Sequence, residues 1–197
     1  DRIVHTGLKD EQDVDGNALS IDDKVEGIIF AVTSSNHSNT RRNPLPLYMR
    51  AMALHDFSAS LGIDSFVYDV DDVGVLPAKD FAKYTVERVE NRSDGRFVLT
   101  PKNTVVLCST PVLEGYEQLG FKILPAELLD KKSGAVRELL PWQILENIVN
   151  SSGDWRSAPA FWSHVHPSSR RLWQSYNTGD MVRSIFHDTV VGDDGDL

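Results

Sequence analysis

The continuous apolar run Gly27-Ile28-Ile29-Phe30-Ala31-Val32 restricts the fold of this chain more than any other feature. A run of β-forming residues without a polar interruption is typical of a strand that is covered on both faces, as in a parallel sheet. The run stops at Thr33-Ser34-Ser35-Asn36-His37-Ser38-Asn39-Thr40, where every residue is polar. The sequence therefore predicts a buried strand whose carboxyl end leads into a polar turn.

Strand and helix patterns alternate after this run. Apolar side chains recur at helical spacing from Leu45 to Leu61, Pro44 and Pro46 stand where a first helical turn tolerates proline, and Gly62 stands where helices commonly end. Further strand patterns cover residues 63–70, 104–108 and 121–124, and helical patterns cover residues 81–90 and 112–119. This alternation predicts an α/β fold with a doubly wound parallel sheet, whose ligands bind beyond the carboxyl ends of the strands.

The two ends of the chain differ from this central part. Residues 2–4 predict a short strand, and residues 139–149 predict a further helix. Residues 155–186 have a helical pattern and carry aromatic side chains that we expect to form a core or an interface. We therefore expect an α/β domain over residues 1–155 and a C-terminal helical extension over residues 156–197.

Composition restricts the partners of the protein. Its 20 basic and 29 acidic residues give a net charge of −9, whereas a broad nucleic-acid-binding surface needs a field of uncompensated Lys and Arg. Cys108 is the single cysteine, which excludes a disulfide framework and a thiolate zinc site and fits a reducing compartment. No apolar run approaches the ~20 residues of a spanning helix. We expect a cytoplasmic protein with neither a nucleic-acid nor a membrane partner.

Several motifs occur in an order that points to one superfamily. The polar segment runs into Thr40-Arg41-Arg42-Asn43-Pro44-Leu45, and Arg50 follows on the predicted helix. The next strand ends in Asp69-Val70-Asp71-Asp72, and Val105-Val106-Leu107-Cys108-Ser109-Thr110-Pro111-Val112-Leu113 joins a strand to a helix start. This order resembles the H-x-G-H nucleotidyltransferase superfamily, most of all the archaeal-type nicotinamide mononucleotide adenylyltransferases and their bifunctional relatives. The resemblance covers residues 27–155.

The resemblance implies a Rossmann-like nucleotidyltransferase fold, ATP and Mg²⁺ as cofactors, and a step of NAD biosynthesis. The reaction is transfer of AMP from ATP to a small phosphorylated acceptor such as nicotinamide mononucleotide. It implies catalytic roles for His5, Arg41, Arg42 and Arg50. Contacts to the nucleotide or the acceptor are implied for Ser34, Ser35, Asn36, Thr40, Asp71, Ser109 and Thr110. No metal ligand set of the protein itself is predicted, because His164 and His166 lack a third ligand at a clear spacing.

The chemistry of the reaction fits these residue types. Adenylyl transfer requires in-line positioning of two phosphates and neutralisation of the developing charge, and arginine binds phosphate bidentately. Short hydroxyl and amide side chains suit a base edge, a ribose or a carboxamide, although they also cap turns and helices. Asp69, Asp71 and Asp72 suit Mg²⁺ or a ribose hydroxyl, with an acidic surface turn as the alternative.

Two signature motifs are incomplete, which keeps other functions open. His5-Thr6-Gly7-Leu8 lacks the last histidine of H-x-G-H, and residues 137–144 lack the Ser and Thr of the late I-S-x-T-x-[IV]-R motif. A nucleotide-binding module without turnover, which regulates an attached partner domain, is the first alternative. The second is an interaction domain whose aromatic helices dock another protein, and a homo-oligomer is a further expectation. Neither a P-loop nor G-x-G-x-x-G is present, which disfavours kinases and dehydrogenases.

Overall fold

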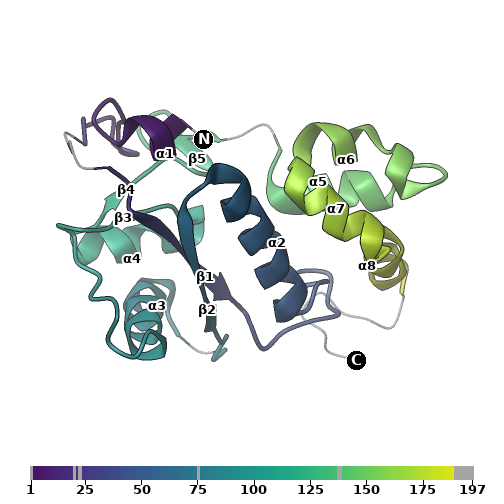
Figure 1. Cartoon of the computed structure of the whole chain (residues 1–197), viewed down its shortest axis with the longest axis horizontal. Coiled ribbons are helices and arrows are strands. Elements are labelled where there is room, and N and C mark those ends of the chain that lie inside the picture. The colour runs from purple at the N-terminus through teal and green to yellow at the C-terminus, as the bar shows by residue number, and fades with distance from the viewer. Residues whose placement is uncertain (1, 20, 22–23, 75, 137–138, 189–197) are drawn as a thin grey trace. The chain divides into compact units, whose positions relative to one another are not determined.

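The computed structural model describes residues 2–19, 21, 24–74, 76–136 and 139–188 of the chain (Figure 1). The protein is mixed α/β, and its described strands form three two-stranded sheets, β1–β2, β3–β4 and β5–β6. Two compact units make up the chain: unit 1 is Asp1–Gly27 with Val73–Glu138, and unit 2 is Ile28–Asp72 with Leu139–Leu197. The α/β class is therefore confirmed, while one doubly wound sheet and a boundary at residue 155 stay predictions.

The start of unit 2 follows the predicted strand, helix and strand. These are β1 (Gly27–Thr33), α2 (Leu47–Leu61) and β2 (Asp64–Val70). The helix begins two residues later than predicted, because a residue that precedes a proline avoids the helical region and Leu45 precedes Pro46. It ends as predicted at Gly62, whose left-handed φ of 68° suits a residue without a side chain.

The carboxyl ends of β1 and β2 lie at the same edge of their sheet. The amide of Ser35, just after β1, donates to the carbonyl of Val70, the last residue of β2, over 3.1 Å. The two strands therefore run in the same direction, and together with α2 they form a βαβ unit.

Helices predominate in residues 139–188, the described C-terminal part of unit 2. They are α5 (Pro141–Val149), the 3₁₀ turn η2 (Trp155–Ser157), α6 (Pro159–His164), α7 (Pro167–Ser175) and α8 (Thr178–His187). The predicted helical character of residues 139–149 and 155–186 is thus confirmed. Three of these helices begin with proline, which fits a first helical position because its missing N–H would have no helical partner there.

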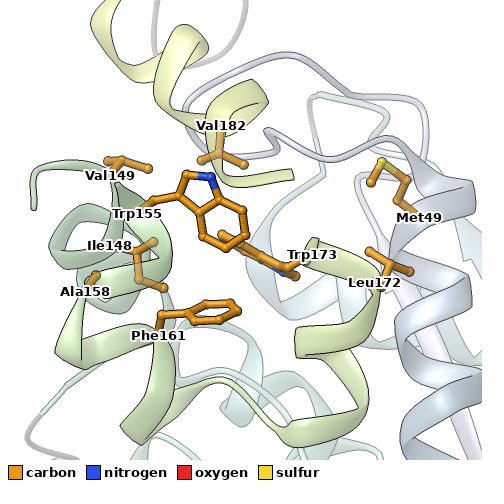
Figure 2. Close-up of a cluster of buried hydrophobic side chains, with 9 residues drawn as sticks. All are labelled: Met49, Ile148, Val149, Trp155, Ala158, Phe161, Leu172, Trp173 and Val182. Carbon is orange, nitrogen blue, oxygen red and sulfur yellow. The ribbon is translucent and has the colours of Figure 1, made fainter. Parts of the chain in front are cut away.

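The core of these helices is centred on Trp155, as Figure 2 shows. The Trp155 ring lies edge-on to Phe161 at a centroid distance of 5.1 Å and to Trp173 at 5.7 Å. Gly179 of α8 packs directly on the indole, since a Cβ at this position would lie 2.1 Å from the ring. Arg183, also on α8, donates to the carbonyls of Val149, Ser151 and Gly153 at 3.0, 3.1 and 2.7 Å, which satisfies the end of α5.

Unit 1 contains the second parallel strand pair. Its elements are α3 (Ala78–Arg92), β3 (Val105–Val106), η1 (Thr110–Val112), α4 (Leu113–Gln118), β4 (Lys122–Ile123), β5 (Leu128–Asp130) and β6 (Ala135–Val136). Strands β3 and β4 are parallel, with Val105 opposite Lys122. Their core consists of Val14, Ala82, Leu113, Tyr116, Phe121 and Ile123. The antiparallel β5–β6 hairpin was not predicted.

The predicted strand at residues 2–4 is wrong. These residues belong to the helix α1 (Arg2–Thr6), which ends at Gly7 with a left-handed φ of 76°. The Gly7 amide donates to the Ile3 carbonyl, so a helix-ending turn overrides the β propensity of Ile3 and Val4. Among the residues described, no helix is long and apolar enough to cross a membrane.

Candidate functional site

The carboxyl edge of β1 and β2 carries a set of polar side chains that bond across the two strand ends. The Ser35 hydroxyl donates to Asp71 Oδ1 over 2.6 Å. The Asn36 amide pairs twice with Asp72: its Nδ2 donates to the carbonyl at 3.0 Å, and its Oδ1 accepts from the backbone N–H at 2.7 Å. The structure therefore brings together Ser35, Asn36 and Asp71, three of the residues that the resemblance assigned to ligand binding.

Arg50 fixes the turn that follows β1. Its Nη1 donates to the Thr33 carbonyl at 3.0 Å, and its Nη2 donates to the carbonyls of Ser34 and His37 at 2.9 and 3.2 Å. Asn43 Oδ1 lies 3.5 Å from Nη1. This geometry follows from the position of Arg50 in the first turn of α2, because helical side chains point toward the helix N-terminus and hence toward the preceding turn.

The hydrogen-bond acceptors around the Arg50 guanidinium are uncharged carbonyl and amide oxygens. Burial lowers the pKa of its guanidinium, yet arginine stays protonated in proteins. The Nε atom is buried and has no hydrogen-bond partner among the described residues. The carbonyl contacts make Arg50 a positioning residue for the turn, and its contact to phosphate stays a prediction.

Thr40 stabilises the later part of the turn through hydrogen bonds to Asn43. It is only 4% exposed, and its hydroxyl accepts from the Asn43 N–H at 2.9 Å while its own N–H donates to the Asn43 carbonyl at 3.3 Å. Ser34 and Asn39 take left-handed φ values of 49° and 59°, which few residues with side chains adopt. The turn is therefore a tightly specified structure, and Thr40 acts as a turn cap.

The remaining two arginines lie on this turn. Arg41 Nη2 donates to the carbonyl of Asp188, at the end of α8, over 3.0 Å. Arg42 is the more exposed of the pair. Both guanidinium groups thus belong to the same part of unit 2 as Ser35 and Asn36.

The other predicted site residues, His5, Ser109 and Thr110, belong to unit 1. His5 is exposed in the last turn of α1. The Thr110 amide and hydroxyl approach Glu127 Oε2 at 3.2 and 3.5 Å, and Ser109 precedes η1 without a side-chain capping bond. Thr110 thus has an acceptor within the protein, and its contact to a nucleotide stays a prediction.

The late signature segment lies only partly within the described chain. Residues 137 and 138 fall outside it, and Gln143 accepts from the Leu140 N–H at 2.8 Å as a cap of α5. His166 caps α7, because its Nδ1 accepts from the Ser168 backbone N–H at 3.3 Å. Both segments therefore have capping roles.

Asn43 was not among the predicted site residues, and Asp72 was considered only together with Asp69 and Asp71, yet both bond to site residues. Two features of the sequence pointed to them: Asn43 directly follows two arginines, and Asp72 directly follows Asp71. Comparison with known proteins adds no relative: no protein-family model matches the chain, and no curated protein matches it.

Proposed function

We propose that this chain is a nucleotidyltransferase-like domain of the cytoplasm that transfers AMP from ATP to a small phosphorylated acceptor such as nicotinamide mononucleotide. The observation that carries the proposal is the β1–β2 edge, where Ser35 and Asn36 bond to the end of β2 beside a turn with Arg41 and Arg42. Ligands of open α/β sheets bind at such an edge. The proposal includes a doubly wound, Rossmann-like plan, because each parallel strand pair is joined through a helix.

The proposed division of roles follows from the contacts. Arg42, as the exposed arginine of the turn, binds a phosphate of the ligand, since guanidinium forms two parallel bonds to phosphate oxygens. Arg41 exchanges the neutral Asp188 carbonyl for a charged phosphate oxygen, which is the stronger acceptor. Arg50 holds the turn that carries both.

The polar cluster supplies the uncharged contacts. Ser34, Ser35 and Asn36 offer hydroxyl and amide groups to a base edge, a ribose or a carboxamide. Mg²⁺ is usually bound in proteins by one or two carboxylates plus substrate phosphates, and Asp71 is the carboxylate at this edge that fits such a role. When bound with ATP, the ion would neutralise charge on the phosphates.

The decisive experiment is a pyrophosphate-release assay with ATP, Mg²⁺ and nicotinamide mononucleotide. We expect release that requires all three and that falls about 10-fold or more in Arg42→Ala, since a lost charged contact to a phosphate costs at least about 1.5 kcal/mol. Arg171→Ala is the matched control, because Arg171 lies on α7 with a side chain that is 75% exposed. Absence of release with either ATP or CTP, over several phosphorylated acceptors, contradicts the catalytic proposal.

A binding module without turnover is the second candidate, and one observation favours it. Both Nη atoms of Arg50 are engaged with the chain itself, so the site has fewer cationic groups for a transition state than the motif suggested. This candidate predicts saturable binding of ATP or nicotinamide mononucleotide by calorimetry, weakened by Arg41→Ala and Arg42→Ala, with no pyrophosphate released. Its partners would be an attached domain or a second copy of the chain.

A further inference from the structure

Unit 1 contains a depression of about 420 Å³ that has no role in the proposed function. It lies where β3 and β4 end, because Leu107 directly follows β3 and Leu124 and Pro125 directly follow β4, and all three line it. The Leu124 amide donates to the Val106 carbonyl at 2.8 Å, so the two strand ends are held together. The carboxyl ends of parallel strands are the usual place for a ligand in α/β folds.

Exposed apolar side chains form one part of the wall of this depression. Leu107 is 66% exposed and Leu129 of β5 is 43% exposed, and both line the same hollow as Leu124 and Pro125. A single exposed leucine is ordinary, but several apolar side chains around one depression mark a surface that gains free energy when it is covered. The wall therefore suits a ligand with an apolar body.

Asp10 and Glu11 are the charged residues among those that line the depression. Their segment is held in place by the backbone: the Leu19 amide donates to the Glu11 carbonyl at 2.9 Å, and the Val14 amide donates to the Ile123 carbonyl of β4 at 3.0 Å. The two carboxyl groups therefore stand beside the apolar wall on a fixed support.

We propose that this depression binds a small organic ammonium compound, with its cationic nitrogen at Asp10 and Glu11 and its apolar body against Leu107, Leu124 and Leu129. Apolar contact provides the affinity, and the carboxylates select a cation over a neutral or anionic analogue. The proposal is independent of adenylyl transfer, since all of its residues belong to unit 1 while the polar turn belongs to unit 2.

The test compares three probes of equal chain length, hexylammonium, 1-hexanol and hexanoate, by amide NMR titration of the full chain. We expect saturable shifts at the amides of Gln12, Leu107 and Leu129 with hexylammonium, and about threefold weaker binding of hexanol, as an exposed ion pair contributes. Hexanoate is expected to bind most weakly. Equal affinities for the three probes, or shifts centred elsewhere in the chain, overturn the proposal.

Matched variants separate charge from apolar contact. Asp10→Asn is expected to remove most of the preference for hexylammonium over hexanol, whereas Asp94→Asn, with the same change of charge at an exposed turn, leaves it intact. Leu107→Ser is expected to weaken all three probes, and Val98→Ser is its control, because Val98 is also 66% exposed. If both members of either pair behave alike, the depression is not the binding site.

A lysine side chain of another protein would present the same ammonium group. N-acetyl-lysine N-methylamide therefore forms a further arm of the titration. We expect it to bind more weakly than hexylammonium, because its polar amides face the leucines of the wall. Tighter binding of the lysine compound overturns the small-molecule proposal in favour of a protein partner.

Discussion

The hydroxyl of Ser35 donates a 2.6 Å hydrogen bond to the carboxylate of Asp71, and this bond joins the residues that follow β1 and β2. Two loops that start 36 residues apart thus form one polar surface. Any ligand of the β1–β2 edge meets this pair as a unit, because the hydroxyl is oriented by the carboxylate.

Ser35→Ala tests the contribution of this pair to stability. A hydrogen bond to a charged group contributes about 1.5–3 kcal/mol when buried, and we expect about 1 kcal/mol for this partly exposed one. Urea unfolding followed by tryptophan fluorescence measures it, since all four tryptophans belong to unit 2. Ser38→Ala, an exposed serine of the same turn, is the control and should change the free energy of unfolding by less than about 0.5 kcal/mol.

Arg50→Lys tests whether the guanidinium positions the turn. A lysine ammonium cannot reach the carbonyls of Thr33, Ser34 and His37 with the same fork of donors, so we expect a loss of about 2 kcal/mol. Amide hydrogen exchange of residues 34–43 should accelerate more than that of α7. Arg171→Lys controls for the loss of an exposed guanidinium, and an equal effect of both variants would argue against the positioning role.

Gly179→Ala tests the packing of α8 on Trp155. In an ordinary helix this change is stabilising by up to about 1 kcal/mol. Here the new Cβ would lie 2.1 Å from the indole ring, so we expect destabilisation of about 1–3 kcal/mol and a shift in tryptophan emission. Ser184→Ala, at an exposed position of the same helix, should be close to neutral. A stabilising Gly179→Ala would refute the packing.

Cys108 is expected to react slowly with thiol reagents. Burial, together with the charges of Glu127 and Glu117, raises the pKa of its thiol from 9.0 to about 11. Since the folded pKa is the higher one, the protonated thiol favours folding below pH 9, and this contribution disappears as the pH rises through about 11. Disulfide-exchange rates between pH 7 and 11 report the titration.

Two carboxylate variants check the cause of the Cys108 shift. Glu127→Gln should move the rate profile of Cys108 to lower pH, because it removes the negative charge that raises the thiol pKa most while keeping an acceptor for Thr110. Glu114→Gln, an exposed carboxylate of α4, should leave the profile unchanged. A profile that is insensitive to Glu127 would leave burial and the charge of Glu117 as the causes.

The elements that could be predicted are those whose ends are marked by proline or glycine, or whose apolar residues follow a clear helix or strand pattern. The boundaries of β1 follow from the extent of its apolar run. Those of α2 follow from the prolines before it and the glycine after it. The β5–β6 hairpin could not be found, because Leu128–Asp130 and Ala135–Val136 are too short to show an alternating pattern. In the case of α1, Ile3 and Val4 suggested a strand, whereas Gly7 determines the structure.

Part of the candidate site could likewise be predicted from the sequence, and part could not. Polar residues at strand ends could be expected to gather at one edge, which is where Ser35, Asn36 and Asp71 lie. The role of Arg50 could not be read from the sequence, because the same guanidinium suits a phosphate and a set of backbone carbonyls equally well. Which of these partners Arg50 meets depends on the backbone conformation of the turn after β1, which the sequence does not reveal.

The contact between Arg41 and the Asp188 carbonyl joins residues that are 147 positions apart, so it can form only after nearly all of the described chain has been synthesised. Unit 2 is assembled from residues 28–72 and 139–188, so its βαβ segment leaves the ribosome well before the helices that share its core. At roughly 5–20 residues per second, the intervening segment 73–138 delays those helices by about 3–13 s. During that interval Met49 of α2 has no tryptophan core to pack against, so this apolar side chain stays uncovered until the C-terminal helices are made.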